Sequence, residues 1–250
     1  MANLEPVVTW IHGENKKDKE ITGVFDFGRV DADKSSAIEI FFLWNNYGGL
    51  VDVPKMEDVT ITTRDLSGGD GTSPLSPVEA VKDNWMQVRI DSLTETAFTP
   101  IGRGGQGTVN PSGVKAMGTK GQTKNVNADT ATAWTANKTL NLEEYIKPTV
   151  ENGFVYKVTQ AGVGGDTEPT WLLTEGLIVN DGTAVLTAVP IMKTPADNEI
   201  LGLANNTQND GTGAENAQGN FVQFSTKAVV PASASTGKNR GNYRVSFRFV

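Results

Sequence analysis

The sequence predicts an all-β fold, an immunoglobulin-like β-sandwich with a second, smaller β-domain inserted between its strands. Segments that alternate apolar and polar residues, as strands with one buried face do, recur through residues 5–100. This pattern stops near Ile101 and resumes near Phe221, and the clearest alternation lies in residues 243–250. We therefore expect the C-terminal strands to pair with those of residues 5–100, and the stretch between them to be an excursion.

Turns rich in Gly, Asn and Asp separate the expected strands of the sandwich. These strands comprise residues 7–12, 21–28, 36–44, 59–64, 85–91, 221–230 and 243–250. Their number matches an immunoglobulin-like sandwich, although the chain lacks the cysteine pair of antibody domains. The nearest helical candidate is residues 77–83, which suffice for about two turns.

The strand expected at residues 36–44 is apolar on both faces. Ile38, Ile40 and Phe42 lie on one face, and Phe41 and Leu43 lie on the other. A strand of this kind is covered on both sides, and we expect the opposing sheet on one side and a neighbouring subunit on the other. Phe41 and Leu43 are our candidates for the subunit contact.

Two stretches rich in Gly and polar residues, 102–121 and 191–219, contain too few apolar residues to bury much surface. We interpret them as linkers that leave and re-enter the sandwich. The expected organisation is a discontinuous sandwich of residues 1–101 and 220–250, a linker at 102–127, an inserted β-module at 128–190 and a return linker at 191–219.

The bulk composition excludes several classes of function. The formal net charge of −7 argues against a nucleic-acid partner, and the absence of cysteine removes disulfides, thiolate metal sites and cysteine nucleophiles. No apolar run approaches the ~18 residues of a membrane span, and the N-terminus lacks a signal-peptide pattern. We expect neither nucleic acid nor membrane as a partner, and synthesis in the cytoplasm.

Catalytic residue patterns are scarce. His12 is the single histidine, so a Ser/His/Asp triad or a His-rich metal site would have to include it. We expect His12 to be structural or solvated at the exposed end of its strand. The Gly-x-Gly pattern at residues 102–107 follows Pro100 and precedes no predicted helix, so it does not indicate a phosphate loop. We predict that the protein is not an enzyme and holds no cofactor or metal.

The inserted module carries five aromatic residues, Trp134, Tyr145, Phe154, Tyr156 and Trp171. In one interpretation these rings form the core that a module of this size requires, and we favour it. In the other, Trp134, Tyr156 and Trp171 form a glycan or surface contact, because sugar-binding modules stack pyranose rings on flat aromatic faces. That interpretation requires the three rings to be exposed and roughly coplanar.

Several short patterns in the inserted segment carry a family resemblance: 134–137, 145–148, 152–156, Gly162, Gly165, 168–171 and 181–183. In these positions the segment resembles a small module of bacteriophage head-fibre, decoration and tail-fibre proteins. That module is itself distantly similar to chitin-binding-type carbohydrate modules.

The outer portion of the chain resembles bacteriophage-encoded immunoglobulin-like proteins, which decorate capsids and tails. The residues that carry this resemblance are 21–32, 42–46, 62–65 and 85–90.

The two resemblances imply a virion structural protein, released by lysis, that docks on the particle through its sandwich and projects the small module. We place it at the tail or baseplate, with capsid decoration or a head fibre as the alternative. The implied partners are other virion proteins (tail, baseplate or major capsid protein), copies of itself in a homo-oligomer, and a host surface glycan. Two other classes stay open: a carbohydrate-binding adhesin, and a glycan hydrolase with two carboxylates ~5–10 Å apart.

Overall fold

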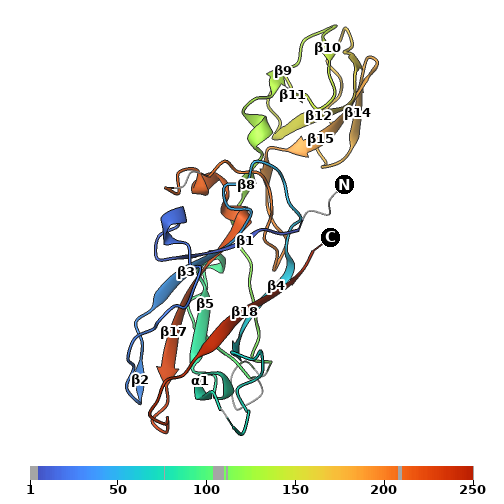
Figure 1. The fold of residues 1–250 in the computed structure, drawn as a ribbon. Coiled ribbons are helices and arrows are strands. Elements are labelled where there is room, and N and C mark those ends of the chain that lie inside the picture. The colour runs from blue at the N-terminus through green and yellow to red at the C-terminus, as the bar shows by residue number, and fades with distance from the viewer. Residues whose placement is uncertain (1–4, 76, 104–109, 111, 208–209, 250) are drawn as a thin grey trace. The chain divides into compact units, whose positions relative to one another are not determined.

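The computed structural model confirms an all-β protein (Figure 1). It describes residues 5–75, 77–103, 110, 112–207 and 210–249. The chain divides into two compact units, unit 1 with residues 1–122 and 194–250, and unit 2 with residues 123–193.

Helical structure in the described residues is confined to short turns. They are α1 (Glu79–Lys82), which falls in the predicted segment, and the 3₁₀ turns η1 (Lys17–Lys19), η2 (Asp91–Leu93), η3 (Val126–Ala128), η4 (Ala214–Asn216) and η5 (Gln218–Asn220). None of these helices has the length and apolar character that crossing a membrane requires.

Unit 1 contains a large antiparallel sheet in the order β1-β3-β17-β5-β6. Its strands are β1 (Val8–His12), β3 (Glu39–Asn45), β17 (Phe221–Val230), β5 (Met86–Ile90) and β6 (Thr99–Ile101), and the short β2 (Lys34–Ser35) pairs with the end of β17.

A small antiparallel sheet packs against the large one. Its order is β18-β4-β7, with strands β18 (Gly241–Arg248), β4 (Glu57–Asp65) and β7 (Lys115–Ala116).

The order of these strands is that of an immunoglobulin-like sandwich. In chain order, β1, β3, β4, β5, β17 and β18 correspond to strands A to F of that fold. The large sheet then has the order A-B-E-D, and strands C and F are neighbours in the small sheet, as the immunoglobulin fold requires. The expected pairing of the C-terminal strands with the N-terminal ones is confirmed. β17 lies between β3 and β5, and Val245 of β18 is opposite Ile61 of β4 (Figure 1).

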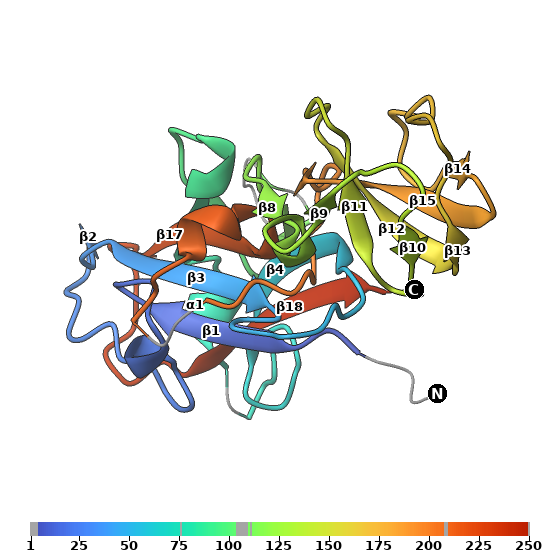
Figure 2. The same ribbon diagram turned by 90° about the horizontal axis from the view of Figure 1, so that it is seen from above.

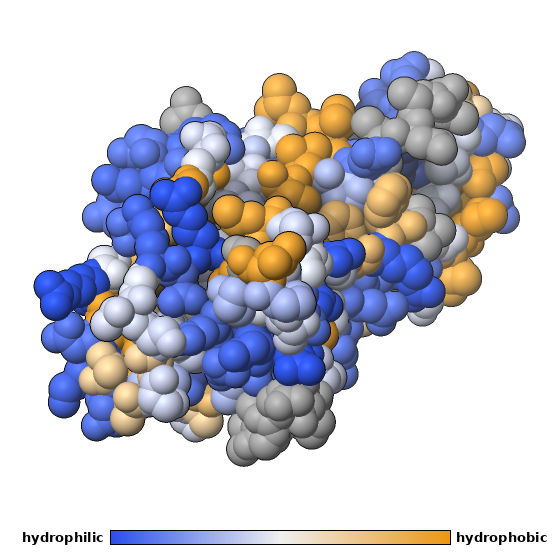
Figure 3. All heavy atoms as spheres, turned by 60° about the horizontal axis from the view of Figure 1, so that its bottom comes forward, coloured by the Kyte–Doolittle hydropathy of each residue, from blue (hydrophilic) through white to orange (hydrophobic). Residues whose placement is uncertain are grey.

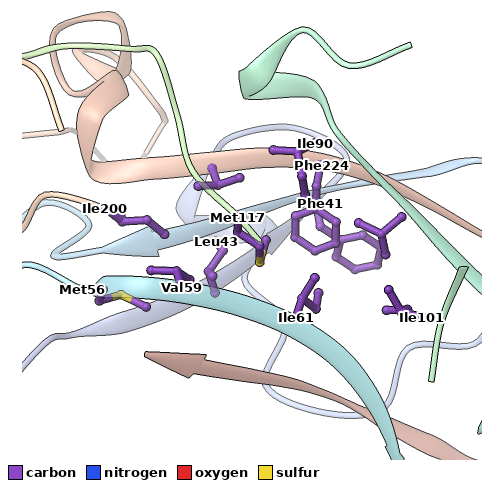
Figure 4. Packing of buried hydrophobic residues seen from close by; sticks show 12 residues of the cluster. Phe41, Leu43, Met56, Val59, Ile61, Ile90, Ile101, Met117, Ile200 and Phe224 are labelled. Carbon is purple, nitrogen blue, oxygen red and sulfur yellow. The ribbon is translucent and has the colours of Figure 1, made fainter. Parts of the chain in front are cut away.

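The core of unit 1 lies between the two sheets (Figure 4). Alternate residues of the large sheet point inward and meet alternate residues of β4, as the pleat requires. The fully enclosed side chains are Phe41, Leu43, Met56, Val59, Ile61, Val88, Ile90, Ile101, Met117, Ile200, Val222 and Phe224.

Two members of this core come from segments that we expected to be linkers. Met117 and Ile200 are both 0% exposed, and the backbone of Ile200 forms a two-way bridge with Met56. Met117 and the short apolar run that begins at Ile200 stand in polar, Gly-rich segments, so the composition of those segments conceals their role. Both expected linkers therefore contribute to the core of unit 1, although their residues 123–127 and 191–193 belong to unit 2. Residues 104–109, 111 and 208–209 lie outside the described residues.

Residues 21–28, expected to form a strand, have no regular secondary structure. The Asp26 carboxylate accepts a hydrogen bond from the Gly28 backbone at 2.8 Å, and Gly28 has a left-handed φ of 75°. A local turn of this kind competes with strand pairing. The segment still joins unit 1, because the Ile21 amide donates to the Trp10 carbonyl and Phe25 packs against Phe41.

Unit 2 contains a five-stranded sheet in the order β14-β15-β12-β11-β9 (Figure 2). Its strands are β14 (Ile178–Asp181), β15 (Ala184–Pro190), β12 (Phe154–Gln160), β11 (Tyr145–Lys147) and β9 (Thr132–Ala133). A second pair joins β10 (Thr139–Leu140) to β13 (Gly162–Val163). Gly182, at φ 58°, turns β14 into β15, as an Asp-Gly pair favours.

The chain enters and leaves unit 2 through two paired strands. β8 (Thr123–Lys124) and β16 (Met192–Lys193) are antiparallel, with Met192 opposite Lys124. The Asn125 amide extends this pairing by donating to the Ile191 carbonyl at 2.8 Å. Both ends of the insertion are thus held next to each other.

Tyr243 of β18 links the two sheets of unit 1. Its hydroxyl group is hydrogen-bonded to the Thr226 hydroxyl at 2.5 Å, and its ring stacks on Trp10 with centroids 6.4 Å apart. Burial raises the pKa of the Tyr243 phenol, with the Thr226 bond acting in the opposite direction.

Replacing Ile200 tests whether the return segment belongs to the core. We expect Ile200→Ala to lower the free energy of unfolding by about 2–5 kcal/mol, because it removes buried methylene groups and leaves a cavity. Ile38→Ala, at a side chain 52% exposed, is the matched control and should change it by less than about 0.5 kcal/mol. Urea denaturation measures both; equal effects would contradict the packing of Ile200.

The raised pKa of Tyr243 predicts a loss of stability in alkali. The unfolded chain releases the phenolic proton near the ordinary pKa of 10.0, whereas the folded chain still holds it. The contribution of the protonated Tyr243 phenol to the free energy of unfolding is therefore complete below about pH 10, and it decreases as the pH rises above that value. Between about pH 10 and 12, we expect the free energy of unfolding of Tyr243→Phe to decrease less steeply with pH than that of the wild type. Chemical denaturation of both proteins at a series of pH values measures this difference.

Candidate interaction surfaces

The structure places Phe41 and Leu43 inside unit 1. They are 3% and 0% exposed, and the Phe41 ring stacks on that of Phe224 with centroids 5.6 Å apart (Figure 4). Neither side chain has surface to offer a neighbouring subunit, so we correct the expected contact: these residues fill the space between the two sheets.

The opposite side of β3 is covered in part by the chain itself. Phe42 and Trp44 form a second cluster with Phe221 and Ala217, and the Trp44 indole donates to the Asn15 side chain at 2.7 Å. The expected cover on both sides is therefore present toward the end of this strand, at Phe42 and Trp44, but not at Ile38 and Ile40. The sequence could not show that residues 214–217, expected to lie in a linker, provide part of the cover.

Toward the start of β3 the outward side of the large sheet is open. Ile38 and Ile40 are 52% and 37% exposed there, and Ile40, Ser225 and Arg89 occupy paired positions on three neighbouring strands. We call this surface the open face and define it by Ile38, Ile40, Arg89, Phe98 and Lys227.

Two cations approach one aromatic ring on the open face. The Arg89 guanidinium carbon lies 5.0 Å from the Phe98 ring centroid, and the Lys227 ammonium lies 4.8 Å from it. Arg89 is held by Asp91, at 2.7 Å from Nε, and donates to the Ser225 hydroxyl at 3.1 Å. Apolar side chains beside a fixed arginine and an aromatic ring have the composition of the core of a protein interface.

Tyr156 is a core residue of unit 2. It is 0% exposed, its hydroxyl accepts from the Asn152 amide at 3.0 Å, and it donates to the Leu172 carbonyl at 3.1 Å. Burial raises the pKa of this phenol. The ring therefore offers no face to a sugar.

Trp134 and Trp171 are half-buried against the same core. The Trp171 ring covers Tyr156 with centroids 4.3 Å apart, and its indole donates to the Glu168 carboxylate at 2.8 Å. The Trp134 indole donates to Asp181 at 2.9 Å. The three predicted contact residues thus form no exposed coplanar platform, which agrees with the interpretation that the rings belong to the core.

Asp181 stabilises the local structure around Trp134. Its carboxylate is 2% exposed and accepts both the Trp134 indole N–H and the Gly165 amide, the latter at 2.8 Å. A buried carboxylate requires such partners, because an unpaired charge in the interior costs several kcal/mol.

The sequence analysis missed an exposed apolar stretch of unit 2. Leu172, Leu173, Leu177 and Ile178 are between 38% and 60% exposed, on the loop after Trp171 and at the start of the edge strand β14. The adjacent pairs Leu-Leu and Leu-Ile in a turn-rich region were the available signal. Hydrophobic residues reach the surface in several separate patches on the face of the protein drawn in Figure 3.

His12, at the end of β1, contacts one carboxylate and two aromatic rings. Its Nε2 lies 2.8 Å from the Glu39 carboxylate, and its ring packs against Phe25 and Phe41. In the described part of the chain no group of three or more His, Asp or Glu side chains is arranged to hold a metal ion.

Comparison with protein-family models, with curated proteins and with solved structures finds no match to this chain. The case for its function therefore depends on its own residues and geometry.

Two carboxylates of unit 2 provide a matched test of the core interpretation, because each accepts one tryptophan indole and one backbone amide. We expect Asp181→Ala, at the buried site, to destabilise unit 2 by about 1–3 kcal/mol. Glu168→Ala, at the exposed site, should cost less than about 1 kcal/mol, because water replaces the lost acceptor. Hydrogen exchange at the amides of β12 reports on unit 2 alone; the reverse order would contradict the structure.

Proposed function

We propose that this protein is a structural component of a bacteriophage virion, located at the tail or baseplate. Its β-sandwich binds the particle, and its inserted unit makes a second contact. In this proposal the protein is not an enzyme. It is made in the host cytoplasm, assembled there and released by lysis.

The position of the insertion carries this proposal. Unit 2 interrupts the sandwich between β7 and β17, and β17 is a central strand of the large sheet. The paired strands β8 and β16 hold both ends of the insertion together. A chain that is anchored on both sides of a second domain is suited to carrying that domain on an assembly.

The open face supports docking by the sandwich. It combines exposed Ile38 and Ile40 with the cations that flank Phe98. Symmetric copies on a particle would add their individually modest contacts, because linked binding events gain from effective concentration. The expected partners are a tail, baseplate or major capsid protein and further copies of this chain.

The apolar stretch of unit 2 supports the second contact, which we place at the tail, with capsid decoration or a head fibre as the alternative. Leu173 and Ile178, 58% and 60% exposed, provide a surface for contact with another molecule. A carbohydrate-binding adhesin is less well supported, because Tyr156 is buried and Trp171 already covers it.

Immuno-gold electron microscopy of intact particles tests the proposal. With an antibody to unit 2, we expect label at the tail or its tip. Label over the head would instead support capsid decoration. Absence of label from every particle, with the protein present in the lysate, would exclude a virion role.

Variants on the open face sharpen this experiment. Ile40→Asp places a charge among the exposed apolar residues and should strongly reduce the protein bound to particles while leaving its fold intact. Leu75→Asp, at a side chain 96% exposed and outside the open face, is the control and should bind like the wild type. Equal labelling of the two variants would show that the sandwich docks through another surface.

A further inference from the structure

One long strand edge of the sandwich has no partner. β18 pairs with β4 along one side, and no described residue pairs with the other side (Figure 1). The other edges of unit 1 are shorter or covered: β6 and β7 span three and two residues, and β1 bonds to Glu20 and Ile21. The bulge between Ser246 and Arg248 limits the regular part of this edge to residues 241–246. We call this part the open edge.

The core is incompletely sealed along the open edge. Tyr243, Val245 and Phe247 point inward and pack against the core cluster, yet all three remain half-buried. β18 holds the position of strand F, beside which an immunoglobulin sandwich places strand G. A strand added at the open edge would cover these three side chains and satisfy the free backbone groups.

The chain segment that contains the open edge is positively charged in a chain that is otherwise acidic, although its Lys227 lies on the open face. Residues 216–250 contain five cations, Lys227, Lys238, Arg240, Arg244 and Arg248, and no acidic residue, whereas the whole chain has a net charge of −7. Arg248 pairs with Glu57 and Asp58, but no salt bridge among the described residues involves Arg244. Arg244 is exposed on the outward side of β18, between the inward-pointing Tyr243 and Val245.

These features specify the chemistry of the occupant. An added strand needs apolar side chains at alternate positions, to cover the half-buried Tyr243, Val245 and Phe247. It needs acidic side chains between them, to pair with Arg244. Pairing of two β18 strands from two copies is disfavoured, because it places the arginines of both strands on the same face of the joined sheet.

We propose that the open edge of β18 accepts a β-strand from a partner protein, in which apolar and acidic residues alternate. Backbone hydrogen bonds provide the affinity for the added strand. Arg244 and the half-buried side chains of β18 select its sequence. The inference deepens the proposed function and rests on it for the source of the strand, another virion protein.

The test uses the purified full-length chain and two synthetic peptides, so it succeeds or fails independently of any particle. One peptide is Thr-Val-Asp-Val-Glu-Val-Asp-Val-Thr, and the other has lysine at its three acidic positions. We expect the acidic peptide to slow hydrogen exchange about tenfold or more at every second amide of β18, where the N–H points away from β4. The lysine peptide should leave these amides unchanged.

A charge reversal checks the role of Arg244. Arg244→Glu should exchange the preference, so that the lysine peptide protects β18 and the acidic peptide does not. Arg29→Glu reverses a cation on the loop after β1, with a side chain 92% exposed, and should keep the wild-type preference.

Three outcomes would overturn the proposal. They are equal protection by the two peptides, protection at the edge of another strand, and no protection by either peptide at millimolar concentration. Protection in the free protein that increases with protein concentration would also overturn it, since it would show that two copies of β18 pair with each other.

Discussion

The fold depends on β17 bonding along both of its edges. This strand pairs with β3 on one side and β5 on the other, and its Val222 and Phe224 enter the core between the sheets. Ser225 of β17 bonds to Asp91, 134 positions earlier in the chain. The large sheet therefore closes only after the chain has passed through unit 2. The entropic cost of closing a loop rises slowly with its length, because each doubling of length adds only about 0.6 kcal/mol.

Period-two alternation predicted most of the strands, because a strand with one buried face must show it. It could not tell which face of residues 36–44 points inward, since Phe41 and Phe42 are equally apolar. It also predicted a strand at residues 21–28, where the Asp26 side chain instead forms a local turn. The roles of Met117 and Ile200 were not predictable from composition, because a few apolar residues in a polar segment are significant only when tertiary structure brings them to a core.

The surfaces were harder to predict than the strands. The sequence does not distinguish which aromatic residues of unit 2 are exposed enough to contact a ligand. In the structure, Tyr156 lies beneath Trp171, and the indole groups of Trp134 and Trp171 are hydrogen-bonded to carboxylates. The open face combines residues from distant parts of the chain, and the open edge depends on which strands pair with β18 and which do not. Only the run without acidic residues after Glu215 was visible in the sequence beforehand.

The pairing of β8 with β16 makes unit 2 an exchangeable cassette. Thr123 is opposite Lys193, so the entry and exit of the insertion are one strand spacing apart, about 5 Å. A different domain whose two termini lie equally close could replace residues 125–191 while the sandwich keeps all of its own strand pairings. Selection could therefore alter what the insertion contacts without altering the scaffold, and a protein engineer could use the same junction to attach a cargo domain.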